Sequence, residues 1–315
     1  MQRKITPLAS SFLFFIFWCA GCAAPKPPAE KTESLSQARQ GFKTKLLLQN
    51  EPKEPLPAPP QDVFRAVTYP APSGNLAAYL SPDPGDGRKR PAIIWITGGD
   101  CNSIGDVWTP APSDNDQTAA AYRKAGIVML FPSLRGGNNN PGVKEGFLGE
   151  VNDVLAAMKY LKKQSYVDAN RIYLGGHSTG GTLAMLVGEY TDSFRAVFAF
   201  GPVDNVSRYG DSPDLLPFDT SNSKERELRS PGLWLSSIRS PVWVFEGSGG
   251  NIADLHAMAK ASTNVKAHFI EIKGASHFET LAPTNELIAK KILRDTGDAG
   301  QITFSAEEVN RNFSP

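Results

Sequence analysis

The sequence predicts an α/β fold in which a mostly parallel sheet is covered by helices on both faces. Short apolar runs at 92–97, 127–131 and 196–200 are typical of strands buried on both sides. Between such runs lie segments with helical spacing of apolar residues, for example 147–163. Buried strands that alternate with helices favour a parallel sheet with a helix at each crossover.

The pattern continues along the chain from residue 64 onward. Strands are expected at 64–69, 76–80, 92–97, 127–131, 171–174, 196–200, 242–245 and 267–272. Helices are expected at 118–124, 147–163, 179–190, 251–261 and 285–293. The first two strands flank a Pro-Ser-Gly-Asn turn and should form an antiparallel edge. Residues 205–239, with three prolines and short apolar runs, should form a small lid over the strand ends.

Composition limits the classes of protein to which the chain can belong. Its 315 residues are 41% hydrophobic and 21% charged, which suits one sizeable domain. The 33 basic and 32 acidic residues give a net charge of +1 without a basic stripe, so no nucleic-acid partner is expected. No His/Cys ligand cluster and no phosphate-binding loop occurs, so no metal and no organic cofactor is expected. The sequence does not indicate an oligomeric state.

Residues 1–21 have the layout of a secretory signal peptide. Arg3 and Lys4 precede an apolar stretch, Ser11–Trp18, that is too short to span a membrane. The following Ala20-Gly21-Cys22 resembles the lipobox of bacterial lipoproteins, although that motif usually begins with an aliphatic residue and here begins with Cys19. The alternatives are an ordinary signal peptide, cleaved one or two residues later, or an uncleaved anchor.

The lipoprotein interpretation implies that Cys22 is lipidated and that the membrane is a partner through this anchor. The residue after Cys22 is Ala23 and not Asp, which favours the outer membrane. We therefore expect a lipid-anchored protein of a bacterial cell envelope that faces the periplasm. Residues 22–61 are expected to form a Pro-rich tether with room for a short helix within 35–48, residues 62–296 the folded domain, and residues 297–315 a loosely ordered tail.

The pattern G-x-S-x-G occurs at Gly176–Gly180, directly between a predicted buried strand and a predicted helix. This context is the one that a nucleophile elbow requires, because glycines two residues to either side of Ser178 permit a sharp turn. The turn would hold Ser178 in a strained backbone conformation with its hydroxyl exposed. Ser178 is the predicted nucleophile.

A serine hydroxyl needs a base to remove its proton, and the chain has four histidines. His177 belongs to the elbow, and its side chain should point away from that of Ser178. His256 lies in a predicted helix and His268 in a predicted strand. His277 follows the last strand, and a serine followed by a histidine near the C-terminus is the order of an α/β-hydrolase. His277 is the predicted base.

The oxyanion hole is expected to combine two loops. The N–H of Thr179 stands at the start of the helix after the elbow. The second donor would be the N–H of Gly99 or Asp100, after the strand 92–97. Cys101 lies in the same loop and is given no catalytic part.

Residues 64–293 resemble the catalytic domain of the prolyl oligopeptidase family and its dienelactone-hydrolase-like relatives, which have the α/β-hydrolase fold. The order of the matching pieces carries the resemblance: Gly98-Gly99, Ser133–Gly137, Glu150 with Asp153, Asn170–Ile172, the elbow, Ser230-Pro231, Pro241-Val242 and Gly274–His277. In that family the acid of the triad lies in a segment of the type H-G-x-x-D. Here the segment is Glu246–Gly250, and Gly250 stands where the aspartate would be.

The acid therefore has to be found elsewhere. Asp204 follows the strand 196–200, a place where some α/β-hydrolases carry their acid, and it is preferred. Glu246, at the end of its own strand, comes next, while Asn251 could only orient His277 and Asp254 lies further along a helix. A Ser–His dyad without a carboxylate is the remaining alternative.

The expected reaction is acyl transfer from an ester, thioester or amide to water through an acyl-enzyme on Ser178. The substrate would be a small molecule or a peptide, and an esterase is preferred to a peptidase because no propeller precedes the domain and the lid is small. The alternatives are a prolyl-oligopeptidase-like peptidase and a catalytically impaired protein that keeps the fold as a binding or scaffold module. The missing aspartate is the best support for the impaired protein.

Overall fold

A computed structural model describes residues 33–48, 54–298 and 300–313. The predicted signal peptide and the predicted lipidation site Cys22 lie outside these residues, and both stay predictions. Among the described residues, no helix has the length and apolar character that crossing a membrane requires.

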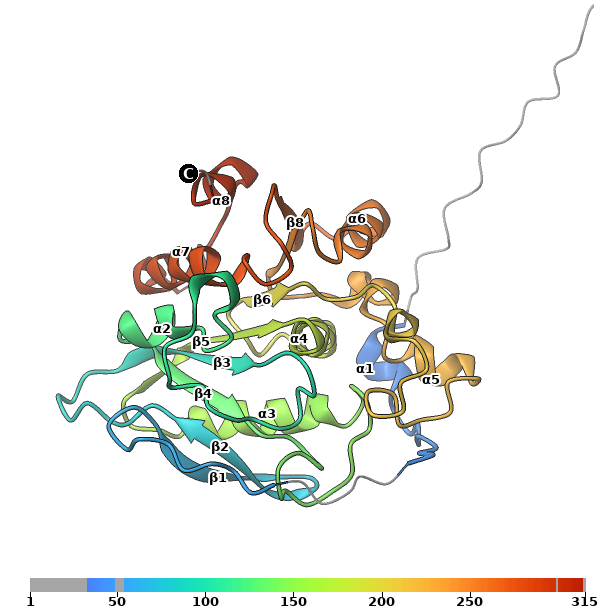
Figure 1. Cartoon of the computed structure of the whole chain (residues 1–315), viewed down its shortest axis with the longest axis horizontal. Helices are drawn as coiled ribbons and strands as arrows, with labels where there is room; N and C mark the ends of the chain where they lie inside the picture. Colours follow the sequence, from blue (N-terminus) through green and yellow to red (C-terminus); the bar gives the residue numbers. More distant parts are fainter. Residues whose placement is uncertain (1–32, 49–53, 299, 314–315) are drawn as a thin grey trace, which may run out of the picture. The chain divides into compact units, whose positions relative to one another are not determined.

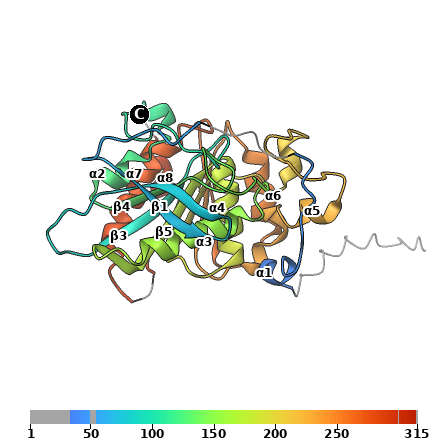
Figure 2. The same cartoon turned by 90° about the horizontal axis from the view of Figure 1, so that it is seen from below.

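The described domain is built on an eight-stranded sheet with the order β1-β2-β4-β3-β5-β6-β7-β8 (Figure 1). The strands are β1 (Arg65–Ala71), β2 (Gly74–Leu80), β3 (Arg90–Ile96), β4 (Val128–Pro132), β5 (Val167–His177), β6 (Val197–Phe200), β7 (Val242–Gly247) and β8 (Ala267–Ile272). The pairs β1–β2 and β2–β4 are antiparallel, and every later pair is parallel. The predicted antiparallel edge is the β1–β2 hairpin, which faces the viewer in Figure 2.

Helices cover both faces of the sheet, as the alternating pattern predicts. One face packs against α3 (Glu150–Leu161), α4 (Thr179–Tyr190) and α6 (Ile252–Ala261), whose apolar side chains share one core cluster. The other face packs against α2 (Ala120–Lys124), α7 (Leu281–Arg294) and α8 (Ala306–Arg311). Strands buried on both sides require apolar residues at every position, and all five residues of β4 are buried accordingly.

The predicted lid at 205–239 is a run of short elements without a strand. It contains the 3₁₀ turns Val206–Tyr209, Pro231–Leu233 and Leu235–Ser237, and the helix α5 (Ser223–Glu227). A buried ion pair between Arg229 and Glu225, 2.5 Å apart, holds it together. The segment follows β6, so it lies at the carboxyl ends of the parallel strands, where sites occur in such sheets.

Part of the predicted tether is folded onto the domain. The helix α1 (Leu35–Ala38) begins with a capping box at Ser34, and it packs against α4 (Figure 1). Leu35 is fully buried, and its N–H donates to Ser237 Oγ at 3.1 Å. Arg39 donates to the carbonyl of Leu228 at 2.6 Å. The short helix expected within 35–48 is therefore present as α1, but residues 34–39 pack on the domain and are not part of an extended tether.

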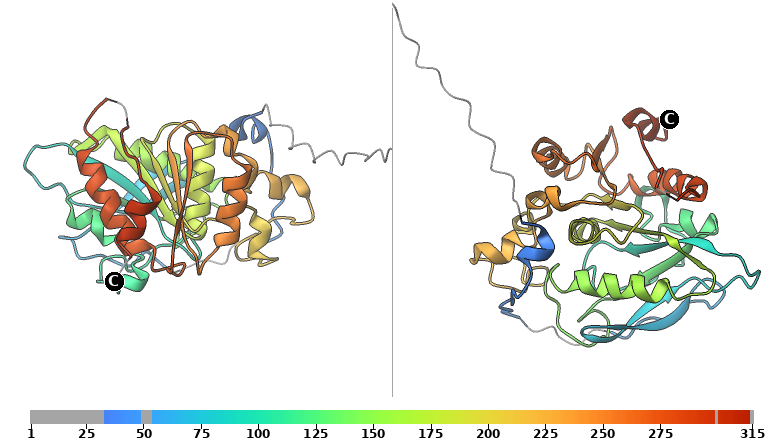
Figure 3. Two further views of the ribbon diagram at one scale, coloured as in Figure 1. Left: turned by 90° about the horizontal axis from the view of Figure 1, so that it is seen from above. Right: turned by 180° about the vertical axis from the view of Figure 1, so that it is seen from behind.

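The expectation of a loosely ordered C-terminal tail was wrong for the described residues 300–313. Ile302, Phe304 and Val309 are buried in the core cluster that α7 completes. The Phe304 ring packs edge-on against Trp243 of β7, 4.8 Å between centroids. Asn310 in α8 donates to the carbonyl of Glu271 at 3.0 Å, so α8 lies against β8 (Figure 3). Three apolar side chains were enough to anchor a segment that is polar on average.

The docking of α1 predicts an effect on stability. Leu35→Ala should lower the free energy of unfolding by about 2–5 kcal/mol, because it empties a fully buried site. Leu47→Ala, at a leucine that is 59% exposed in the same segment, should change it by less than about 0.5 kcal/mol. Urea unfolding of the folded chain measures both. Equal effects of the two substitutions would show that α1 is not docked in solution.

Candidate active site

Ser178 occupies the sharp turn between β5 and α4. Its backbone has φ 57° and ψ −118°, a left-handed conformation that is strained for a residue with a side chain. The flanking glycines make the turn possible, because a Cβ on Gly180 would come within 2.5 Å of the carbonyl oxygen of Thr97. The N–H of Ser178 donates to the carbonyl of Phe200 at 2.7 Å, which joins the elbow to the end of β6. The predicted strand–elbow–helix arrangement is present.

His277 lies in the loop after β8, and its ring is held by Glu246 at the end of β7. The distance from His277 Nδ1 to Glu246 Oε2 is 2.9 Å, and the Glu246 side chain is 1% exposed. The other carboxylate oxygen, Oε1, accepts the N–H of Gly247 at 2.7 Å. Both oxygens of this carboxylate are therefore engaged, one by the histidine and one by the backbone.

Two glycines leave the space that this pair fills. A Cβ on Gly201, at φ +58°, would lie 2.7 Å from both Glu246 Oε2 and His277 Nδ1. A Cβ on Gly250 would lie 2.7 Å from the carboxyl carbon of Glu246. The carboxylate of Glu246 thus stands where a side chain of residue 250 would begin. The resemblance placed the family's aspartate at this same position.

Asp204, which sequence analysis preferred as the acid, does not contact His277. Its N–H donates to Asp254 Oδ1 at 3.1 Å, and its carboxylate faces Arg208 at 3.5 Å. Burial, and next a hydrogen bond that the protonated Asp254 carboxyl donates to Asp204, raise the pKa of Asp254 to about 6. Asp204 therefore belongs to a separate acidic pair beside the lid, and the geometry favours Glu246, the second choice. The sequence does not separate the two carboxylates, because each lies at or after the end of a strand.

In the described residues the Ser178 hydroxyl makes no hydrogen bond to His277. Catalytic hydrogen bonds of this kind often tighten only when substrate is bound. The ring of His177, the residue before the nucleophile, does reach the loop after β8 that carries His277, here called the base loop. Its Nε2 lies 3.2 Å from the carbonyl oxygen of His277. The sequence predicted only that this ring points away from Ser178.

The loop after β3 carries the predicted oxyanion donors Gly99 and Asp100. The hydroxyl of Thr179 donates to the carbonyl of Gly99 at 2.9 Å, which ties this loop to the first residue of α4. Lys144, almost fully buried, donates to the carboxylate of Asp100 at 2.6 Å and to its carbonyl at 3.2 Å. The N–H of Thr179 is one of the helix N-terminal amides that have no acceptor within the helix. Both predicted halves of the oxyanion hole thus lie side by side.

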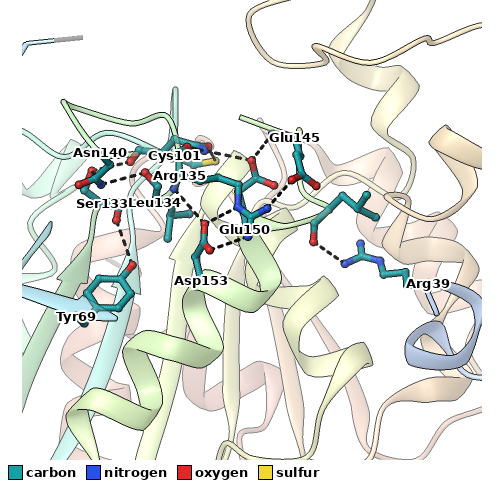
Figure 4. A network of polar contacts seen from close by, with 12 residues as sticks. Arg39, Tyr69, Cys101, Ser133, Leu134, Arg135, Asn140, Glu145, Glu150 and Asp153 are labelled. Atoms are coloured by element: carbon teal, nitrogen blue, oxygen red, sulfur yellow. Dashed lines mark hydrogen bonds and ion pairs between the residues drawn. The ribbon is translucent and has the colours of Figure 1, made fainter. Parts of the chain in front are cut away.

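A buried polar network supports this loop from beneath (Figure 4). Asn102 donates to the carbonyl of Arg135 at 2.7 Å and to Glu150 at 3.2 Å. The Arg135 guanidinium forms a two-point contact with Asp153, with both nitrogen–oxygen distances 2.8 Å. Ser133 donates to the carbonyl of Asn102 at 3.0 Å. The motif residues that the resemblance singled out are therefore the support of the loop that carries Gly99 and Asp100.

His256, His268 and Cys101 take no part in the contact between His277 and Glu246. His256 contacts Glu271 on the surface, and His268 stacks on Trp243. Burial raises the pKa of the Cys101 thiol to about 12, so this side chain is not a thiolate at neutral pH. Among the described residues, no group of three His, Cys, Asp or Glu side chains could hold a metal ion.

Comparison with known proteins agrees with this architecture. The model of the prolyl oligopeptidase family matches residues 113–230. Acylamino-acid-releasing enzyme of Rattus norvegicus is 27% identical over 194 residues, which are 54% of this chain and 26% of that enzyme. Feruloyl esterase B of Neurospora crassa is 25% identical over 181 residues, covering 54% of this chain and 59% of the esterase. The chain thus spans about a quarter of the rat enzyme's length.

Solved structures show the same fold. A puromycin-hydrolyzing peptidase of Mycobacterium tuberculosis superposes with a TM-score of 0.58 at 19% identity, over 73% of this chain and 38% of that one. The described residues therefore form an α/β-hydrolase-fold domain that contains, at residues 113–230, a match to the prolyl oligopeptidase family, a family of serine hydrolases.

Proposed function

We propose that this chain hydrolyses an ester or amide through an acyl-enzyme on Ser178, with His277 as the base and Glu246 as the acid of the triad. His277 Nε2 takes the proton of the Ser178 hydroxyl as the oxygen attacks the carbonyl carbon. The same proton then passes to the leaving group. Water activated by His277 next hydrolyses the acyl-enzyme, which releases the carboxylic acid product and restores Ser178. The contact between His277 and Glu246 carries the proposal.

That contact supports a base in the correct tautomer. A carboxylate only accepts, so the proton of neutral His277 must be on Nδ1, and Nε2 is left with its lone pair for the serine. When His277 becomes positively charged, the buried Glu246 carboxylate at 2.9 Å stabilises the charge. The arrangement weakens the alternative of an impaired scaffold, whose best support was the missing aspartate.

The oxyanion hole completes the proposed machinery. The N–H groups of Thr179 and of Gly99 or Asp100 would stabilise the negative oxygen of the tetrahedral intermediate. The hydrogen bond from Thr179 Oγ1 to the Gly99 carbonyl fixes the two halves relative to each other before substrate binds. Fixed donors of this type commonly account for about 10²–10³ in rate for each donor removed.

The relatives include peptidases and an esterase. The peptidases among them support an amide substrate for this chain, which the sequence alone had ranked below an ester. The first relatives are acylamino-acid-releasing enzymes, and a dipeptidyl-peptidase 5 of Porphyromonas gingivalis is 28% identical over 195 residues. We propose peptides and acylated amino acids as the second class of substrate beside simple esters.

A serine-directed probe tests the nucleophile. The folded wild type should be labelled by a fluorophosphonate and should hydrolyse p-nitrophenyl acetate, and Ser178→Ala should abolish the labelling and lower turnover at least about 10³-fold. Thr182→Ser, on the same helix beyond the elbow, is the matched control and should keep the labelling. A folded wild type that takes no label would support the binding module instead. Turnover of acetyl-alanine p-nitroanilide, measured beside the ester, shows whether amides are cleaved.

Substitution of Glu246 tests the acid. In Glu246→Gln, the N–H of Gly247 holds the amide oxygen, so the NH₂ group faces His277 Nδ1 and favours the wrong tautomer. We expect kcat to fall about 10³–10⁴-fold, the size of such a tautomer effect in serine proteases. Asp204→Asn is the matched control and should change kcat less than threefold, because Asp204 does not contact the base. A tenfold loss of kcat in Asp204→Asn, with no loss in Glu246→Gln, would identify Asp204 as the acid.

Because Gly250 has no side chain, it permits a rescue experiment. Glu246→Ala should be as impaired as Glu246→Gln, and adding Gly250→Asp should recover at least tenfold in kcat. The reason is that the new carboxylate grows into the space that the Glu246 carboxylate occupies. Gly250→Asp alone should be impaired, since two carboxylates would compete for one site. Absence of recovery in a double variant that folds would contradict the spatial equivalence of the two positions.

Gly201 tests the space around the pair. Gly201→Ala places a methyl group 2.7 Å from Glu246 Oε2 and His277 Nδ1, so the pair must move and kcat should fall about 100-fold. Gly126→Ala is the matched control, since Gly126 has a similar φ of +74° with open space around it. It should cost only about 1 kcal/mol of stability and leave kcat unchanged. Similar kcat values in the two variants would show that the pair tolerates displacement.

A further inference from the structure

The side chain of His177 links the nucleophile elbow to the base loop. His177 is the last residue of β5, where it is opposite Phe200 of β6, so the sheet fixes its backbone. Its ring is fully buried and lies 4.5 Å from the His277 ring, centroid to centroid. Its Nε2 is 3.2 Å from the His277 carbonyl oxygen. The residue before the nucleophile thus contacts the main chain of the base, one hundred positions later.

The partners of the ring determine its tautomer. A carbonyl oxygen only accepts, so His177 Nε2 must carry the proton that it donates to His277. The second ring nitrogen, Nδ1, lies 3.0 Å from the amide nitrogen of Gln117. That amide also donates to Asn115 Oδ1 at 2.9 Å, and an NH₂ group has two protons to give. Nδ1 therefore accepts, and both contacts describe the same neutral imidazole.

The ring remains neutral where the proposed reaction takes place. Burial first, and the nearby His277 second, lower the pKa of His177 to about 3. A charged His177 would repel the imidazolium that forms on His277 during catalysis. As a neutral ring, it holds the base loop without opposing that charge.

We infer that His177 is a positioning residue, which sets the distance between Ser178 and His277 by donating from Nε2 to the His277 main-chain carbonyl. Thr280 Oγ1 donates to the same oxygen at 3.1 Å, so this carbonyl has two donors, and Glu246 holds the ring separately. The main chain and the ring of the base are thus fixed by different residues. The inference rests on the proposed function for its effect on catalysis, although its geometry does not.

Two substitutions separate the hydrogen bond from the packing. His177→Gln keeps an N–H donor at the ε position, and His177→Phe keeps a ring of similar size without a donor. We expect His177→Phe to lower kcat about 30–100-fold with KM within twofold, because a misplaced base slows the chemical step and not binding. His177→Gln should keep at least a third of kcat. His256→Phe, at the exposed histidine, is the control and should equal the wild type.

Other results would overturn the inference. Equal loss in His177→Gln and His177→Phe would mean that the packing of the ring matters and the donor does not. Full activity in His177→Phe would mean that the link is dispensable. Melting temperatures measured for each variant identify a general loss of the fold. Such a loss would lower the number of sites that the fluorophosphonate labels, so kcat is expressed per labelled site.

A spectroscopic readout tests the geometry without activity. In the wild type labelled with ¹⁵N-histidine, which has four histidines, ring nitrogen shifts should show one imidazole as the neutral Nε2–H tautomer with no titration between about pH 5 and 9. His177→Gln assigns that signal by its loss. An Nδ1–H tautomer or a titrating His177 would overturn the inference. If the spectrum is as expected but the folded wild type takes no fluorophosphonate label, the proposed function is overturned and the geometry of His177 is not.

Discussion

The site depends on the room that glycines leave around one buried carboxylate. Glu246 reaches His277 from the end of β7 because residues 201 and 250 carry no side chain. Its second oxygen is held by the N–H of Gly247, so the carboxylate has one orientation. A buried carboxylate is costly unless its oxygens are hydrogen-bonded, and here each oxygen has a partner, His277 Nδ1 or the N–H of Gly247. The orientation of the His277 ring follows from that placement.

Much of the fold could be predicted because the strongest signals were local. Short apolar runs such as 128–132 and 197–200 are typical of buried strands, and both are buried strands in the structure. The glycines of Gly176–Gly180 lie between such a strand and a helix, which identified the elbow. The pair of Ser178 and His277 was predicted from chain order, and the structure places His277 against a carboxylate. The segments 34–39 and 300–313 were underestimated, since a few buried side chains, among them Leu35 and Phe304, anchor otherwise polar stretches.

The acid could not be predicted from the sequence because its position depends on side-chain direction and not on strand order. Asp204 and Glu246 both stand at the carboxyl ends of neighbouring parallel strands. Only the packed structure shows that Asp204 shares its surroundings with Asp254, whereas Glu246 points at His277. A glycine at 250 could have been a signal: it marks space that another group must fill. The contact between His177 and His277 left no signal in the sequence at all.

The C-terminal segment that packs on β7 has a consequence for the newborn chain. Phe304 lies against Trp243 and Phe245, in the strand that carries the proposed acid, and it comes after the elbow in the chain. The elements that form the elbow, β3, β5 and α4, precede β7, β8 and this segment in the chain. In a chain made from its N-terminus onward, Ser178 therefore leaves the ribosome before Glu246 and His277, its proposed partners. Under the proposed mechanism, the Ser178 hydroxyl has no base until His277 has been synthesised and β8 has formed.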